Sequence, residues 1–298
     1  FQVVSVRLLP LPRDRPGGPS HFTSTIRIRM RQPSSAFTGK TVWVTGASSG
    51  IGQALAIEFA RQGARVVVSA RRTEALEQTR AQCVELGGEA AVVPLDLADE
   101  ASHAEAARRA AEPFGPVDIL VHSGGITSRG LASETLIEVD HQVMQVNFFG
   151  TISVTRQVLP SMRERGSGHI VVITSVTGKI GTQYRSAYAA SKHALHGWFD
   201  SLRLEVDREG VAVTLVCPGF IATDLTLHAL TPDGSPLNQM NEAQQNGMPS
   251  DVFARKLLPG IAARRHEIVI GGKETVTIPI KRFFPRLLHE ILLRSKVT

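Results

Sequence analysis

The chain contains 298 residues, 42% of them hydrophobic and 20% charged, which is enough to bury one large core and predicts a single domain. Its formal net charge of +6 comes from residues 1–40, where seven basic residues stand against one acidic residue, so the remainder is neutral overall. A neutral body gives no support for a nucleic-acid-binding surface. Two cysteines, Cys83 and Cys217, are too few for a disulfide framework or a zinc site, and no spacing of His, Cys and Asp predicts a metal.

Residues 1–38 lack the pattern of a folded segment, and residues 10–20 combine Pro, Gly and charge in a way that predicts disorder. The segment is rich in Arg, contains Ser and is poor in acidic residues, which is the composition of an organellar transit peptide. The alternative is that the native chain starts at Met30 and that the residues before it are translated upstream sequence. No run of about 18 apolar residues predicts a transmembrane helix, so we expect a cytoplasmic protein unless the leader directs it to an organelle.

From about residue 40, short apolar runs alternate with segments of helical pattern. The predicted strands are 41–45, 65–69, 90–94, 118–122, 169–174, 211–216 and 267–270. The predicted helices are 52–62, 72–86, 99–111, 134–164 and 185–208. Because the strands are apolar throughout, we expect helices on both faces of a parallel α/β sheet with right-handed crossovers. Such a sheet binds ligands at the carboxyl ends of its strands.

The first predicted strand leads into a glycine-rich turn, 45–52 (TGASSGIG), and a helix follows at once. Its three glycines permit a tight turn, close approach of the backbone to a pyrophosphate, and close packing of the helix on the strand. The amides and the positive end of the helix then receive the anion. The candidate dinucleotide-binding residues of this turn are Gly46, Ser48, Ser49, Gly50, Ile51 and Gly52.

The second predicted strand ends near Ala70, where an NAD-preferring site would carry an acidic residue for the ribose 2′-hydroxyl. Arg71 and Arg72 follow instead, and Arg71 could bind a 2′-phosphate, so we expect NADP(H) rather than NAD(H). A charge-assisted hydrogen bond of about 1.5–3 kcal/mol corresponds to a preference of about 10- to 150-fold. The alternative is a solvated pair of arginines at a helix start. Asp96, just past the third strand, could accept from the adenine amino group or cap the next helix.

Tyr188 and Lys192 are four residues apart at the start of a predicted helix, which places both on one face. A nearby ammonium lowers the pKa of a phenol, and the pair can exchange a proton with a carbonyl oxygen while hydride moves. Ser175 ends the fifth predicted strand, where its hydroxyl could hold the substrate oxygen beside Tyr188. Asn147 lies inside a long helical segment, where a buried amide could bond backbone and hold a water near Lys192; ordinary helix packing is its alternative role.

Together these motifs resemble the short-chain dehydrogenase/reductase family, over about residues 39–272. The resemblance implies a doubly wound Rossmann-type sheet of strand order 3-2-1-4-5-6-7, an Asn–Ser–Tyr–Lys tetrad on the four residues above, and homodimers or homotetramers. Further cofactor contacts that it implies are Leu97, Gly124, Pro218, Gly219, Ile221 and Thr223, with Asn147, Tyr188 and Lys192 contacting the cofactor as well. Segments 185–198 and 281–298 resemble the subgroup around dehydrogenase/reductase member 7. The sequence departs from the family at 122–125, where His-Ser-Gly-Gly replaces the usual Asn-Asn-Ala-Gly.

We take residues 39–278 as the catalytic domain. Residues 224–250 mix apolar and small polar side chains and predict a mobile lid over the substrate. Residues 279–298 predict an amphipathic C-terminal helix that could lie in a membrane interface, contact a second subunit, or cover the body of the protein.

The predicted activity is that of an NADP(H)-dependent carbonyl reductase or alcohol dehydrogenase. It transfers hydride reversibly between a primary or secondary alcohol, expected to be lipophilic, and its aldehyde or ketone. The alternative is a non-enzymatic nucleotide-sensing or scaffold protein on the same fold. A complete tetrad argues against that alternative, because a protein that only binds has no use for a phenol–ammonium pair.

Overall fold

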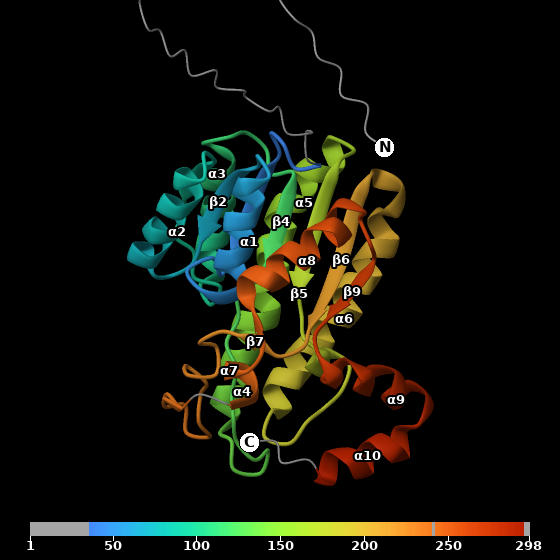
Figure 1. The fold of residues 1–298 in the computed structure, drawn as a ribbon. Helices are drawn as coiled ribbons and strands as arrows, with labels where there is room; N and C mark the ends of the chain where they lie inside the picture. The colour runs from blue at the N-terminus through green and yellow to red at the C-terminus, as the bar shows by residue number, and fades with distance from the viewer. Residues whose placement is uncertain (1–35, 240–241, 295–298) are drawn as a thin grey trace, which may run out of the picture. The chain divides into compact units, whose positions relative to one another are not determined.

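Seven short parallel strands form the central sheet of the computed structural model, which describes residues 36–239 and 242–294 (Figure 1). The strands are β1 (Thr41–Thr45), β2 (Arg65–Ser69), β3 (Glu89–Val92), β4 (Ile119–His122), β5 (Gly168–Ile173), β6 (Val211–Pro218) and β9 (Glu267–Ile270). Their order, β3-β2-β1-β4-β5-β6-β9, confirms the predicted topology, with β9 in the seventh place. The two remaining strands, β7 (Ile221–Ala222) and β8 (Met248–Pro249), pair with each other in a separate small sheet.

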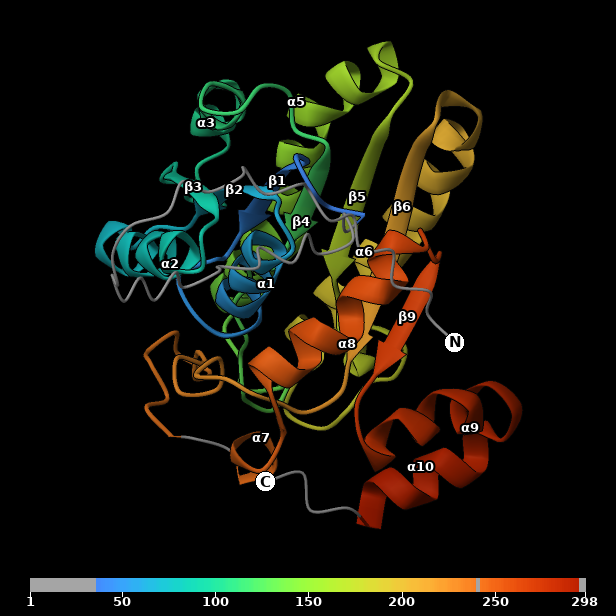
Figure 2. The ribbon, with the colours of Figure 1, turned by 45° about the horizontal axis from the view of Figure 1, so that its top comes forward.

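Helices cover both faces of the sheet (Figures 1 and 2). One face carries α1 (Gly50–Arg61), α2 (Thr73–Glu85) and α8 (Ser250–Ala262), and the other carries α3 (His103–Ala111), α5 (Gly150–Glu164) and α6 (Ser186–Val206). Side chains of β1 alternate between the two cores, since Val42 and Val44 join the first and Trp43 the second. All described residues belong to one compact unit, which agrees with the predicted single domain.

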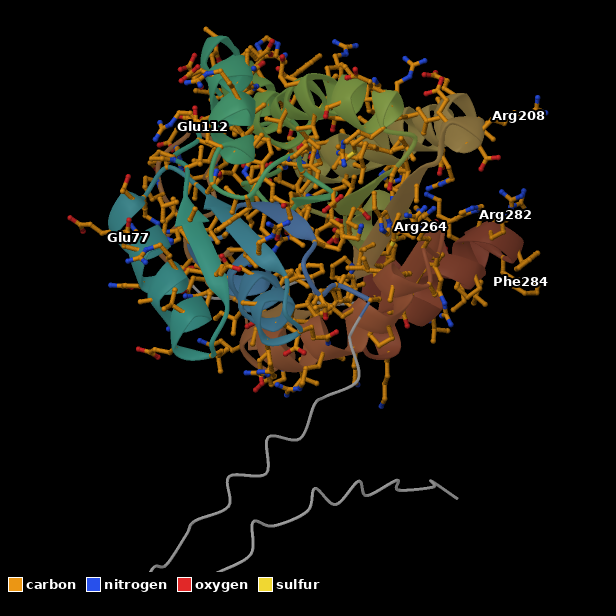
Figure 3. The ribbon with its side chains drawn as sticks, turned by 90° about the horizontal axis from the view of Figure 1, so that it is seen from above. Glu77, Glu112, Arg208, Arg264, Arg282 and Phe284 are labelled. Carbon is orange, nitrogen blue, oxygen red and sulfur yellow. The ribbon has the colours of Figure 1, made fainter. Side chains whose placement is uncertain are left out.

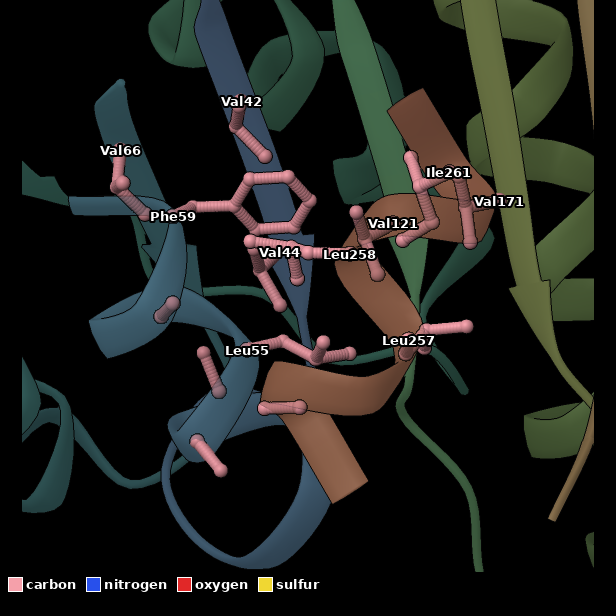
Figure 4. Packing of buried hydrophobic residues seen from close by; sticks show 14 of the residues in the cluster. Val42, Val44, Leu55, Phe59, Val66, Val121, Val171, Leu257, Leu258 and Ile261 are labelled. Carbon is pink, nitrogen blue, oxygen red and sulfur yellow. The ribbon is translucent and has the colours of Figure 1, made fainter. Parts of the chain in front are cut away.

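The first of these cores brings together helices that are far apart in the sequence (Figure 4). Leu55 and Phe59 of α1 lie over the valines of β1, while α8 adds Leu257 and Leu258 to the same core. Phe37 also enters this core, with its ring 5.0 Å from that of Phe59, so the folded body begins before residue 38, where the sequence placed the end of the leader. Residues 1–35 of the predicted leader lie outside the described residues.

The C-terminal segment forms two helices, α9 (Thr277–Phe283) and α10 (Pro285–Arg294), so the prediction of one helix over 279–298 was wrong. Phe284 between them has non-helical backbone, with φ −136° and ψ 61°, because the ring of Pro285 disfavours helical geometry in the residue before it. Leu288 of α10 is buried against Val176 and Ile180, which fixes α10 to the body. Among the described helices, none is both long and apolar enough to cross a membrane.

Candidate active site

A cavity of about 810 Å³ opens where β1, β2, β5 and β6 end, as expected for a parallel α/β sheet. Thr45, Ser69, Ile173 and Pro218, the last residues of these strands, all lie in its wall. Residues from both the glycine-rich turn and the Tyr-Lys helix also line it, so the two groups of predicted site residues share one cavity.

The glycine-rich turn between β1 and α1 forms one end of the cavity, and all six of its predicted residues line the wall. Gly46 and Gly50 have φ of +69° and +57°, which side chains rarely tolerate. A Cβ on Gly52 would lie 2.3 Å from the carbonyl oxygen of Gly46, so only glycine lets the helix start this close to the turn. Ser49 is the N-cap residue of α1 but its side chain makes no capping bond. The turn therefore has the backbone geometry of a phosphate-binding site.

Both arginines after β2 line the same end of the cavity. Arg72 donates from Nη2 to Ser48 Oγ (3.3 Å) and to Ser49 Oγ (3.4 Å), which ties it to the glycine-rich turn. Asp96 also lines the wall, and its Oδ1 accepts from the Ala98 amide at 3.0 Å, so the carboxylate helps to shape the turn after β3.

Leu97 and Gly124 complete this end of the cavity. A Cβ on Gly124 would lie 2.6 Å from Leu97 Cδ1, and one on Gly46 would lie 2.5 Å from Gly124 Cα. The glycine at 124 thus preserves the close approach of the two turns, although the sequence around it departs from the family pattern. His122 before it is buried, bonds Thr155 Oγ1 at 2.8 Å, and has a pKa lowered to about 3 by burial, so it is neutral.

Tyr188 and Lys192 lie on one face of α6, as their spacing predicts, and both line the cavity. Lys192 Nζ is 5.7 Å from the centroid of the Tyr188 ring and donates to the carbonyl oxygen of Ile173 at 3.1 Å. Burial lowers the pKa of Lys192 to about 8, because few groups around the ammonium replace its hydration.

The phenol of Tyr188 is also buried, and burial raises its pKa, opposite to the direction expected from the sequence. The guanidinium of Arg185 and a hydrogen bond with Ser175 oppose that rise without cancelling it. Tyr188 is consequently protonated at neutral pH in the ligand-free protein. Ser175 lies at the carboxyl end of β5, where its Oγ also accepts from the Thr177 amide at 3.1 Å.

Asn147 lies behind the cavity wall rather than in it. It sits in a five-residue π-helical turn, Gln145–Phe149, between α4 (Ile137–Met144) and α5, and such turns often occur at functional sites. Its amide oxygen accepts from the Ile126 amide at 2.8 Å, and its amide nitrogen donates to the Ile126 carbonyl and to Ser191 Oγ at 2.9 and 3.0 Å. Asn147 therefore holds the loop after β4 against α6, next to Lys192.

The residues predicted at and after the end of β6 also line the cavity: Pro218, Gly219, Ile221 and Thr223. Sequence reasoning missed the two side chains that brace them. Glu274 Oε1 accepts from the amides of Phe220 (2.9 Å) and Gly272 (2.8 Å), and Gln244 Nε2 donates to Thr223 Oγ1 at 2.9 Å. Neither residue belongs to a motif, so no local pattern marks it.

The predicted lid is partly described, since residues 240–241 lie outside the described chain. Its first part is fastened to the loop after β4. The Leu230 amide donates to the carbonyl oxygen of Thr127 at 2.9 Å, and the Arg129 amide donates to that of Leu230 at 2.8 Å. Other wall residues at this end include Leu225 and His228 of the predicted lid and Ile291 and Leu292 of α10. Ile180 and Arg185 also line the wall, and the sequence did not identify them as site residues.

A doubly wound sheet that places a glycine-rich turn and a Ser, Tyr and Lys around one cavity defines a dinucleotide-binding oxidoreductase. The family model described as short chain dehydrogenase matches residues 40–232, and the chain belongs to this family. Its members are oxidoreductases that bind a nicotinamide cofactor and act on CH–OH groups.

Within the family, the chain is similar to proteins of the member 7 type. It is 39% identical to dehydrogenase/reductase SDR family protein 7-like of Drosophila melanogaster, over 91% of this chain and 85% of that protein. It is 37% identical to dehydrogenase/reductase SDR family member 7B of Rattus norvegicus, over 90% of this chain and 85% of that protein. An alcohol dehydrogenase from Thermococcus sibiricus, solved in complex with 5-hydroxy-NADP, has the same fold, with a TM-score of 0.69 and 24% identity over 79% of this chain and 97% of that one.

Proposed function

We propose that the protein catalyses reversible, NADP(H)-linked hydride transfer between an alcohol and the corresponding ketone or aldehyde. The observation that carries this proposal is the convergence of Tyr188, Ser175 and Lys192 on the same cavity as the glycine-rich turn. A nucleotide-sensing or scaffold protein would need the turn but not a buried phenol and ammonium beside it. Turnover of a carbonyl compound with NADPH, lost when Tyr188 is changed, distinguishes the two functions.

The residues of the cavity fit a nicotinamide dinucleotide from end to end. The glycine-rich turn would hold the pyrophosphate. The wall near Asp96 and Leu97 would hold the adenosine, and the wall near Pro218 and Thr223 would hold the nicotinamide. When bound, the nicotinamide supplies a hydride to a carbonyl carbon or accepts one from an alcohol carbon.

Side chains of the protein transfer the proton and bind the carbonyl oxygen of the substrate. In reduction, Tyr188 gives its phenolic proton to the carbonyl oxygen as the carbon gains hydride, and in oxidation it takes that proton back. Ser175 donates a hydrogen bond to the same oxygen and keeps it beside the phenol. The Lys192 ammonium stabilises the phenolate left after proton transfer, while Asn147 keeps the supporting loop in place. Because burial keeps Tyr188 protonated, the ligand-free site is prepared for reduction.

The proposed preference for NADP(H) rests on Arg71, which lines the cavity together with Arg72 where an acidic residue would favour NAD(H). Arg71→Ala should raise the KM for NADPH by about 10-fold or more and leave the KM for NADH nearly unchanged, since only NADPH carries the 2′-phosphate. Steady-state kinetics with both cofactors measure this. Arg72→Ala is the companion variant, because Arg72 bonds the serines of the glycine-rich turn and should affect both cofactors. Equal effects of Arg71→Ala on both cofactors would remove the 2′-phosphate role.

A lipophilic substrate is supported by the walls around the catalytic residues. Val176 and Ile180 follow Ser175, Phe220 and Leu225 come from the segment after β6, and Ile291 and Leu292 come from α10. An apolar chain that leaves water for these walls gains about 25 cal/mol for each Å² that it buries.

Membrane contact through α9 and α10 is also proposed, because their outer surface combines apolar and basic side chains. Phe283 and Phe284 are 72% and 63% exposed, and Lys281, Arg282 and Arg286 are exposed around them. Figure 3 shows Arg282 and Phe284 projecting outward from these helices. Such a surface fits the boundary between anionic headgroups and acyl chains.

The protein should therefore sediment with vesicles that contain anionic lipid, and Phe283→Ser with Phe284→Ser should abolish this. Leu204→Ser is the matched control, because Leu204 of α6 is 82% exposed and lies outside the C-terminal helices. The membrane proposal would be contradicted if the folded parent protein does not sediment with anionic vesicles, or if the double variant binds them as well as the parent.

A further inference from the structure

Arg185 is a cation in the wall of the cavity that the proposed reaction does not use. It precedes α6, one turn before Tyr188, and its guanidinium carbon is 5.9 Å from the centroid of the Tyr188 ring. Its Nη1 donates to Thr127 Oγ1 at 2.9 Å, which holds the guanidinium at the loop after β4. Thr127 is completely buried, so this anchor is part of the folded body.

No acidic residue among the described residues forms an ion pair with Arg185. Its pKa is lowered chiefly by burial and further by the positive charge of Arg129, while only the phenol of Tyr188 acts in the opposite direction. A half-buried guanidinium has lost much of its hydration, and proteins normally compensate that loss with a carboxylate. The hydrogen-bond partner of the Arg185 guanidinium is instead the uncharged hydroxyl of Thr127.

The acidic residues that line the cavity do not replace the missing partner. Glu274 accepts from the amides of Phe220 and Gly272, and Asp96 accepts from Ala98 after β3. Asp224 and His228 are both exposed, and neither is among the groups that shift the pKa of Arg185. The electrostatic surroundings of Tyr188 on the substrate side are therefore dominated by Arg185.

We propose that Arg185 binds an anionic group, a carboxylate or a phosphate, on the carbonyl substrate. This inference rests on the proposed reductase function and narrows its substrate class to compounds that combine a ketone or aldehyde, an apolar chain and an anion. A guanidinium carries five N–H donors in a planar fork, and the bond to Thr127 uses one of them. Two parallel hydrogen bonds to an oxyanion would hold the substrate in one orientation, with its carbonyl beside Tyr188.

The test compares substrates in matched pairs: straight-chain keto-carboxylates of different lengths, each with its methyl ester, and one keto-phosphate of similar length. The parent protein, Arg185→Met and Arg185→Lys are assayed with NADPH. The readout is the ratio of kcat/KM for the anion to kcat/KM for its ester. A ratio is used because Arg185 also contacts the Tyr188 ring, and both members of a pair share that effect.

We expect the parent protein to favour an anion over its ester by about 10-fold or more at the best chain length. Arg185→Met should reduce that ratio by about 10- to 100-fold. Arg185→Lys should keep part of the preference for the anion. It should keep more of it for the phosphate than for the carboxylate, because an ammonium is a point charge and cannot form the two parallel bonds of a guanidinium. If only the keto-carboxylates show this preference and its loss in Arg185→Met, the natural anion is a carboxylate. If the keto-phosphate shows a stronger preference and a larger loss, the natural anion is a phosphate.

An unchanged ratio in Arg185→Met, with both substrates slowed equally, would overturn the proposal and leave Arg185 as a positioning residue for Tyr188. Calorimetric binding of the same keto-carboxylates and esters to the NADPH-loaded protein separates this inference from the proposed function. Anions that bind through Arg185 without turnover would support the anion site and contradict the reductase. Turnover of esters and anions alike would support the reductase and contradict the anion site.

Discussion

Tyr188→Phe should lower kcat by at least about 10²–10⁴ while the KM for NADPH stays within a few-fold of the parent value. The change removes only the phenolic oxygen, so the ring and its packing on α6 remain and the proton that the carbonyl oxygen needs is lost. The hydrogen bond with Ser175 is lost as well, which leaves Ser175 to hold the substrate oxygen alone. Initial rates of NADPH oxidation over a range of carbonyl concentrations give both parameters.

The chain offers a matched control in its other tyrosine, Tyr184, which is 39% exposed and lies outside the cavity wall. Tyr184→Phe should keep the parent kcat. Retention of most of the activity in Tyr188→Phe, with the control also active, would assign the proton transfer to another group.

Lys192→Met should have opposite effects on stability and on activity. The pKa of Lys192 is lowered from about 10.5 to about 8, which corresponds to about 3 kcal/mol of destabilisation at neutral pH. Met fills a similar volume without a charge, but the bond to the Ile173 carbonyl is lost at a cost of about 1 kcal/mol. We therefore expect the ligand-free variant to be more stable than the parent by about 2 kcal/mol, and kcat to fall by about 10² or more.

Urea unfolding at several pH values measures the stability part. Between pH 8 and 10.5 the unfolded chain still carries the proton of Lys192 and the folded chain has lost it, so the parent gains stability as pH rises through this range. The advantage of Lys192→Met should shrink correspondingly. Lys179→Met is the control, because Lys179 is paired with Glu267 at 2.6 Å near the surface and its loss should bring no gain. A Lys192→Met variant that is less stable than the parent at pH 7 would contradict the buried-charge account.

The parallel, helix-covered sheet could be predicted because continuous apolar runs and right-handed crossovers are local or general properties. The order of its strands came from the resemblance to the short-chain dehydrogenase/reductase family. The helices at the C-terminal end were harder to predict. Helix α8 was missed because Pro259 and Gly260 interrupt its pattern, although Phe253 and Leu257 bury one face of it against the sheet. The last helix is divided because Pro285 acts on the residue before it, an effect that amphipathic periodicity does not register.

Within the site, the residues that the sequence identified share motifs with short spacing, such as the glycine-rich turn and the pair Tyr188 and Lys192. The residues that it missed act across long separations. Glu274 braces a turn at Phe220, and Arg185 is anchored by Thr127, so each needs the folded chain to reveal its partner. The sign of the Tyr188 pKa shift was also wrong, because the spacing of Tyr and Lys contains no information on how deeply the phenol is buried.

The most direct test of the proposed chemistry follows the hydride itself. The protein is incubated with a carbonyl compound and NADPH that carries deuterium at the transferable position, and the alcohol product is analysed by mass spectrometry and NMR. We predict deuterium on the carbinol carbon with the parent protein and none above background with Tyr188→Phe. A protein that binds NADPH tightly yet transfers no deuterium to any ketone or aldehyde, with or without an anionic group, would contradict the oxidoreductase and favour a nucleotide-binding role.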